Sequence, residues 1–76
     1  MLLQSQDGSV LIQTTTVLIH YEKERNIYYL CACNNNREFD VGIFDTEFQA
    51  QTVLKDVQKY LESSEANSIY QVPYRI

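Results

Sequence analysis

The first 44 residues alternate short apolar runs with polar breaks, a pattern typical of β-strands joined by turns. Residues 2–5 and 9–13 form the first two runs. The break between them contains Gln6-Asp7-Gly8, and Gly8 can adopt the positive φ that a tight turn requires. We expect these residues to form a β-hairpin.

Three longer runs follow, at residues 15–21, 27–33 and 37–44. The first two are rich in β-branched and aromatic residues and flank the charged segment 22–26. The third follows the asparagines of 34–36 and alternates apolar with polar residues. We therefore expect three antiparallel strands that are joined by turns at 22–26 and 34–36.

The periodicity then changes to that of a helix over about 46–62. Asp45 or Thr46 can cap this helix, and Thr46 has Gln49 at the capping-box spacing. At about 3.6 residues per turn, one side of the helix is apolar and comprises Ala50, Val53, Leu54, Val57, Tyr60 and Leu61. Residues 69–72 are expected to form a last short strand. Pro73 lacks a backbone N–H, so it restricts this strand to the edge of a sheet or marks its end.

These elements predict an α+β fold. It consists of an antiparallel meander sheet of about five to six short strands, with one helix packed on one face and a short C-terminal strand. A chain of 76 residues can build one modest core. We therefore expect a single domain over residues 1–76.

Turn symmetry assigns the faces of the predicted sheet, because directly opposed residues share a face. A symmetric first turn places Tyr21 opposite Ile27, and a symmetric second turn places Cys33 opposite Arg37. One face is then almost wholly apolar and is expected to pack against the helix. It comprises Val17, Ile19, Tyr21, Ile27, Tyr29, Cys31, Cys33, Phe39, Val41 and Ile43.

The opposite face of the predicted sheet is too rich in apolar side chains for a surface that only contacts water. Leu18, Tyr28, Leu30 and Phe44 form a contiguous patch there, with His20 among them. Two explanations remain open. Either the first hairpin or the last strand covers this patch within the chain, or the patch is an interface, for which a homo-oligomer is the simplest assembly.

Phe48 is a further interface candidate, because the helical period places it on the polar side of the helix with Thr52, Lys55 and Lys59. An exposed Phe can be a binding hot spot. Alternatively, it packs down on the preceding loop, as residues of a first helical turn often do. The candidate interface residues are therefore Leu18, His20, Tyr28, Leu30, Phe44 and Phe48.

Charge and composition narrow the classes of partner. Ten acidic and six basic residues give a net charge of -4, and the basic residues are scattered. This argues against a nucleic-acid partner, because phosphate neutralisation needs clustered Lys and Arg. No apolar run approaches the ~20 residues that cross a bilayer, and Met1-Leu2-Leu3 lacks the features of a signal peptide. We expect a cytoplasmic protein that does not bind membranes.

Cys31 and Cys33 are the only cysteines. On a strand they would point to one face about 6.5 to 7 Å apart, which is too far for a disulfide. A zinc site takes four ligands and His20 is the only histidine, so we expect buried free thiols, no metal and no cofactor. His20 also lacks a nucleophile or carboxylate at a known catalytic spacing, so we do not expect an enzyme.

The chain opens with Ser5-Gln6-Asp7-Gly8, continues with Gly42-Ile43-Phe44-Asp45-Thr46-Glu47 and closes with Tyr70-Gln71-Val72-Pro73. In this order and spacing the segments resemble a group of small, mostly uncharacterised phage- and prophage-encoded proteins of Gram-positive bacteria. That group usually has Pro-Tyr-Glu shortly after the opening turn, where this chain has residues 13–16. The resemblance implies a mobile-element origin and a bacterial cytoplasm, and it brings no catalytic residues.

The expected function is that of a non-enzymatic phage-type accessory protein that acts by protein–protein interaction. We expect it to be a homo-oligomer and to present its sheet face or its helix to a host-cell protein. The alternative is a counter-defence protein that sequesters a small ligand or nucleotide. In that case Tyr28, Tyr70 and Tyr74 would stack on a base at a subunit boundary.

Overall fold

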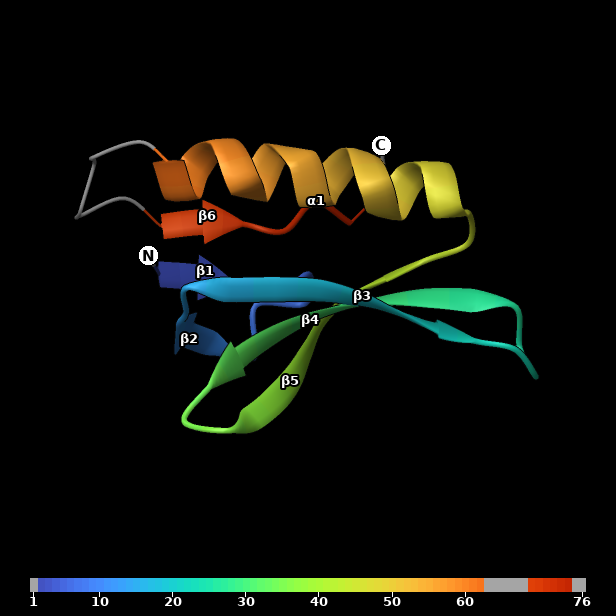
Figure 1. The fold of residues 1–76 in the computed structure, drawn as a ribbon, viewed down its shortest axis with the longest axis horizontal. Helices are drawn as coiled ribbons and strands as arrows, with labels where there is room; N and C mark the ends of the chain where they lie inside the picture. Colours follow the sequence, from blue (N-terminus) through green and yellow to red (C-terminus); the bar gives the residue numbers. More distant parts are fainter. Residues whose placement is uncertain (1, 63–68, 75–76) are drawn as a thin grey trace.

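A computed structural model describes residues 2–62 and 69–74, and its strands and helix follow the predicted order (Figure 1). The elements are β1 (Leu2–Gln4), β2 (Leu11–Gln13), β3 (Thr16–Glu22), β4 (Ile27–Asn34), β5 (Arg37–Phe44), α1 (Glu47–Glu62) and β6 (Ile69–Gln71). The run predicted at 37–44 matches β5 at both ends. The other elements differ from their predictions by one or two residues at an end.

The strands divide into two three-stranded sheets. In the first sheet, β1 and β2 form the predicted hairpin, and β6 pairs parallel to β1, so segments from opposite ends of the sequence lie side by side (Figure 1). In the second sheet, β3, β4 and β5 form the predicted antiparallel meander. The α+β class is confirmed, and the terminal strands form a sheet of their own instead of extending the meander.

The turn between β4 and β5 is shorter than predicted. Asn35 and Asn36 have φ angles of 50° and 65°, so both adopt the left-handed conformation of a two-residue type I′ turn. Asn tolerates this conformation because its short polar side chain can hydrogen-bond locally. As a result, Arg37 pairs with Asn34 and not with Cys33.

The turn between β3 and β4 is also one residue shorter, because Glu22 pairs with Ile27. A shift of one residue turns every side chain of a strand to the other face. The predicted faces of β4 were therefore wrong. Its residues that face the core and the helix are Tyr28, Leu30 and Ala32, and those that face away are Tyr29, Cys31 and Cys33.

A β-bulge reverses the facing of the last residues of β5. Val41 is the extra residue, between Asp40 and Gly42. Beyond it, Phe44 faces the core and is buried, whereas Ile43 faces away and is 50% exposed. The prediction had placed these two residues on the opposite faces.

Both sheets and the helix share one core. It contains Leu3, Ile12, Leu30, Ala32, Val41, Phe44, Ala50, Val53, Val57, Tyr70 and Val72. The predicted apolar side of α1 is confirmed, since three of its residues are buried here and the other three pack against them. The predicted cap is also present, because Thr46 Oγ1 accepts a hydrogen bond from the Gln49 backbone N–H at 3.1 Å.

Candidate functional site

Three of the predicted interface residues lie on the inner side of the second sheet. Leu30 and Phe44 are buried in the core that the helix and the first sheet share, so their predicted place on the face opposite the helix was wrong. Tyr28 is half-buried on the same side. The shift in register is the cause for Tyr28 and Leu30, and the bulge at Val41 is the cause for Phe44. The chain covers these residues itself.

Leu18 and His20 lie on the outer face of the second sheet, which is the face turned away from α1. Leu18 pairs with Cys31 and is half-buried, and His20 pairs with Tyr29 and is exposed. In the described part of the chain, no hydrogen bond involves the His20 side chain. Besides Leu18, this face carries the polar side chains of His20, Glu38 and Asp40.

The outer stripe of α1 is the side of the helix turned away from the core, and it comprises Phe48, Thr52, Lys55 and Lys59. Phe48 is 79% exposed, so it does not pack on the preceding loop. The Thr52 hydroxyl donates a hydrogen bond to the Phe48 carbonyl at 2.8 Å. Lys55 and Lys59 are exposed one turn apart, and neither forms an ion pair with a carboxylate in the described part of the chain. The stripe is thus an aromatic side chain followed by two positive charges.

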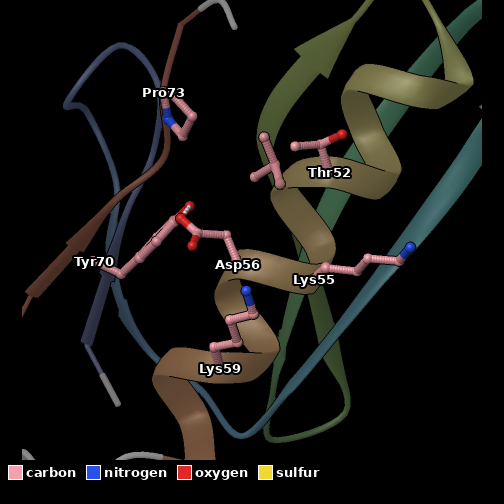
Figure 2. A pocket seen from close by; sticks show the side chains of 7 residues that line it. Thr52, Lys55, Asp56, Lys59, Tyr70 and Pro73 are labelled. Carbon is pink, nitrogen blue, oxygen red and sulfur yellow. Dashed lines mark hydrogen bonds between the residues drawn. The ribbon is translucent and has the colours of Figure 1, made fainter.

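A groove of about 290 Å³ runs beside this stripe, between α1 and the segment that contains β6 (Figure 2). Thr52, Lys55 and Lys59 line it from the helix, and Tyr70 and Pro73 line it from the other wall. Figure 2 shows Lys55 directed away from Tyr70, toward the outside of the helix. The groove therefore has an apolar wall and a basic rim.

Tyr70 ties the two walls of the groove together. Its hydroxyl donates a hydrogen bond to Asp56 Oδ2 at 2.8 Å, and its ring lies edge-on to Tyr60 with 5.2 Å between centroids. Burial, together with the bond to the Asp56 carboxylate, raises the pKa of Tyr70 above its ordinary value. The hydroxyl is consequently a donor at neutral pH and holds Asp56 on the strand side of the helix.

The thiol of Cys31 is not available as a nucleophile. Its side chain is 3% exposed, and Sγ donates to Asp40 Oδ1 at 3.2 Å. Burial first, and then the bond to Asp40, raise the pKa of Cys31 to about 12. Since the thiolate is the reactive form, this position is chemically quiet. Cys33 lies on the same face, as predicted, and both cysteines are free.

The β1–β2 turn carries a carboxylate that is held in its charged form. Asp7 Oδ1 accepts hydrogen bonds from Ser9 Oγ at 2.7 Å, from the Ser9 N–H at 2.9 Å and from Ser5 Oγ at 2.7 Å. These bonds, with those from Ser9 largest, lower the pKa of Asp7 to about 2. Asp7 is therefore ionised at neutral pH.

Gln6 joins this turn to β5 and to the residues after β6. Its Oε1 accepts a hydrogen bond from the Ile43 N–H at 2.7 Å, and its Nε2 donates to the Ile43 carbonyl at 3.1 Å and to the Pro73 carbonyl at 3.0 Å. Sequence reasoning noted the Ser5-Gln6-Asp7-Gly8 turn but missed this role. The sequence alone does not show whether a polar side chain in a turn bonds to backbone atoms or to water.

A hollow of about 240 Å³ lies between this turn and the outer face of β5, and we refer to it as the β5 hollow. Tyr29, Val41 and Ile43 provide apolar lining. Asp7 and Asp40 add two carboxylates to its wall. The hollow thus combines an apolar surface with negative charge, which is the opposite polarity to the outer stripe of α1.

The three tyrosines of the ligand-sequestering alternative do not gather at one place. Tyr28 lies near Glu47, whose charge contributes to raising the pKa of Tyr28, whereas Tyr70 bonds to Asp56. Nine residues of helix separate these two carboxylates, which is about 13 Å along the axis. Tyr28 and Tyr70 therefore lie apart within one chain, and the stacking site at a subunit boundary stays a prediction.

Comparison with protein-family models, with curated proteins and with solved structures finds no match. Within residues 2–62 and 69–74, no three His, Cys, Asp or Glu side chains cluster as metal ligands would. In that same part of the chain, α1 has neither the length nor the hydropathy to cross a membrane.

Proposed function

We propose that this chain is a non-enzymatic phage-type accessory protein that acts by protein–protein interaction, associates with itself and uses the outer stripe of α1 as a contact surface. The resemblance of its opening, central and closing segments to phage- and prophage-encoded proteins supports an accessory role in the bacterial cytoplasm. The same surface is available to a host-cell protein.

The exposure of Phe48 carries this proposal. At 79%, it is the most exposed of the large hydrophobic side chains in the described residues. Burying such a side chain in an interface stabilises a complex by about 1.5 to 3 kcal/mol. Phe48 also sits in the first turn of a capped helix that packs on the second sheet, so its backbone is fixed before a partner binds.

Solution mass measured by sedimentation velocity over a wide range of concentrations tests the proposal. We expect wild-type protein to self-associate as concentration rises and Phe48→Asp to remain monomeric. Leu11→Asp is the matched control, because Leu11 is 56% exposed on β2, outside the helix. Wild-type protein that stays monomeric throughout would refute self-association, and equal effects of both substitutions would refute the role of the helix.

A further inference from the structure

We propose that the chain carries both halves of its own interface. The outer stripe of α1 in one copy docks on the outer face of β5 in a second copy, where Phe48 enters the β5 hollow, Lys55 faces Asp40 and Lys59 faces Glu38. This inference rests on the proposed function and names a second copy of the chain as the partner.

Glu38, Asp40 and Ile43 share the outer face of β5. They pair with Cys33, Cys31 and Tyr29, which alternate along β4 and therefore point to one side. Glu38 and Asp40 are exposed, and Ile43 is 50% exposed. The bulge at Val41 creates this arrangement, because without it Ile43 would point to the core.

The two surfaces match in spacing. On the helix, Lys55 lies about 10 Å along the axis from Phe48, and Lys59 lies about 6 Å further. On the extended strand, Asp40 lies about 10 Å from Ile43, a little less because of the bulge, and Glu38 lies about 6.6 Å further. When α1 of one copy runs antiparallel to β5 of the other, Phe48 thus meets Ile43. In the same arrangement, Lys55 meets Asp40 and Lys59 meets Glu38.

The two surfaces also match in charge. Lys55 and Lys59 form no ion pair with a described carboxylate, in a chain whose net charge is -4. The β5 surface adds Asp7 to Glu38 and Asp40, and the lowered pKa of Asp7 keeps it negative. Two carboxylates of α1 lie near these lysines. The bond of Asp56 to Tyr70 directs it to the strand side, and Glu62 is exposed three residues after Lys59. Complementary potentials of this kind set orientation and register in an interface.

The β5 hollow is a suitable receptor for Phe48. The hollow measures about 240 Å³ and is lined by the apolar parts of Tyr29, Val41 and Ile43. Occupation by a phenyl ring would cover the exposed half of Ile43 along with most of Phe48. Aromatic side chains that fill pockets and are surrounded by polar contacts are the usual hot spots of interfaces.

The stripe and the β5 surface lie on opposite sides of the second sheet, because α1 packs on the inner side and Glu38, Asp40 and Ile43 face outward. A two-fold axis cannot pair both surfaces at once between two copies. The contact is therefore heterologous, and it builds a closed ring or an open chain of subunits.

Charge reversal on each surface tests the inference by sedimentation velocity. The helix variant is Lys55→Glu with Lys59→Glu, and the strand variant is Glu38→Lys with Asp40→Lys. Each alone should weaken self-association about ten-fold or more, because like charges then face one another. An equimolar mixture of the two variants should regain association, since every acidic surface again finds a basic one. Added salt should weaken the wild-type assembly.

Two control variants carry the same changes in net charge at exposed sites outside the interface. Lys23→Glu with Arg25→Glu matches the helix variant, and Glu24→Lys with Leu11→Lys and Gln13→Lys matches the strand variant. Both should associate as the wild type does. Thermal unfolding by circular dichroism shows that each variant is folded before its mass is interpreted.

The outcomes separate this interface from self-association as such. A mixture that remains monomeric, or a reversal variant that associates as strongly as its control, overturns the interface while wild-type association still supports the proposed function. Wild-type protein that is monomeric at every concentration overturns both. A photo-crosslinking amino acid at position 48 locates the contact directly. We expect crosslinks to residues 29 and 40–43 of another copy. Crosslinks to other residues would contradict the docking.

Discussion

The two sheets of this domain are built in different ways. Strands β3, β4 and β5 contain seven or eight residues and follow one another in sequence, and α1 packs on all three. Strands β1, β2 and β6 contain three residues each, and β6 arrives from the other end of the sequence. Strands that short gain little from their own hydrogen-bond ladder.

Side chains that bond to backbone atoms support the shorter sheet. Gln6 bonds to the backbone of β5 and of Pro73, and Gln71 Nε2 donates to the Ser5 carbonyl at 2.8 Å. Apolar packing stabilises both sheets, since Leu3, Ile12 and Tyr70 are buried in the shared core, and polar side-chain contacts are an additional support of the β2–β1–β6 sheet. Substitutions in the two regions should consequently differ in how much they lower the free energy of unfolding and in how far their effects extend through the domain.

Leu30→Ala should have the largest effect, because Leu30 is fully buried at the centre of the second sheet. Loss of its side chain leaves a cavity and should lower the free energy of unfolding by about 3 kcal/mol. That is a large part of the stability of a domain of this size. Urea denaturation followed by circular dichroism measures the change.

Leu18→Ala provides the matched control on the outer face, where the side chain is half-buried. It should cost clearly less than Leu30→Ala. Equal losses in the two variants would mean that the two faces of the β3–β5 sheet are not distinguished as the register indicates.

Gly42→Ala should have the next largest effect, because Gly42 lies where the two sheets meet. A Cβ added there would lie 3.0 Å from Val72 Cγ1 and 3.1 Å from Phe44 Cε2. Both neighbours are buried, so they cannot move aside freely, and overpacking of this kind costs about 1 to 3 kcal/mol. Urea denaturation is again the measurement.

The control for Gly42→Ala is Gly8→Ala. Gly8 has a φ of 76°, and a Cβ added there would lie 3.6 Å from Gln4 Nε2, which is an ordinary contact, so Ala there strains only the backbone. The expected loss is about 1 kcal/mol. A smaller loss for Gly42→Ala than for Gly8→Ala would contradict the close contact between β5 and the segment after β6.

The sequence pattern was sufficient for the elements and insufficient for their pairing. Runs of β-branched and aromatic residues and the helical period of α1 are local signals, so each element was predicted close to its observed bounds. Register depends on turn conformation, and two asparagines with positive φ shortened the β4–β5 turn by one residue. The β3–β4 turn is also shorter by one residue, and the two shifts together exchanged the faces of β4 and moved Leu30 to the core.

The candidate site was predictable to the same extent. The helical period placed Phe48 on the polar side of α1, and the structure shows it exposed. The β5 hollow was not predictable, because residues 5–9 and 40–43 approach each other only in the folded chain, through contacts of Gln6. The bulge at Val41 has no signature in the alternating pattern, so the exposure of Ile43 was missed.

Gln6→Ala tests the polar half of the comparison and should have a moderate effect. Its side-chain amide is the partner of the Ile43 N–H and carbonyl and of the Pro73 carbonyl. Their loss should cost about 1 to 2 kcal/mol, since water can replace part of these bonds at an exposed site. Hydrogen exchange should show the Ile43 amide losing protection while amides at the centre of β4 change little.

Gln4→Ala is the control for Gln6→Ala, because the Gln4 side chain makes only a long bond of 3.5 Å to the Gly8 carbonyl. It should leave exchange at Ile43 unchanged. Uniform loss of protection across β4 in Gln6→Ala would show that the two sheets unfold as one unit and would remove the distinction between them.

Asp7→Asn should have the smallest effect at neutral pH, because the amide retains an acceptor oxygen for Ser5 and Ser9. In the wild type, hydrogen bonds from Ser9 lower the pKa of Asp7 from 3.8 to about 2. The ionised form is thus favoured in the folded state, so its contribution to stability is present above pH 3.8 and is lost as the pH falls toward 2. Nuclear magnetic resonance titration of the Asp7 carboxyl should give the lowered pKa, and Ser9→Ala should raise it toward 3.8. A carboxyl that titrates near 3.8 in the wild type would show that the turn does not hold Asp7 in its charged form, and the charge of the β5 hollow would then follow pH in the acidic range.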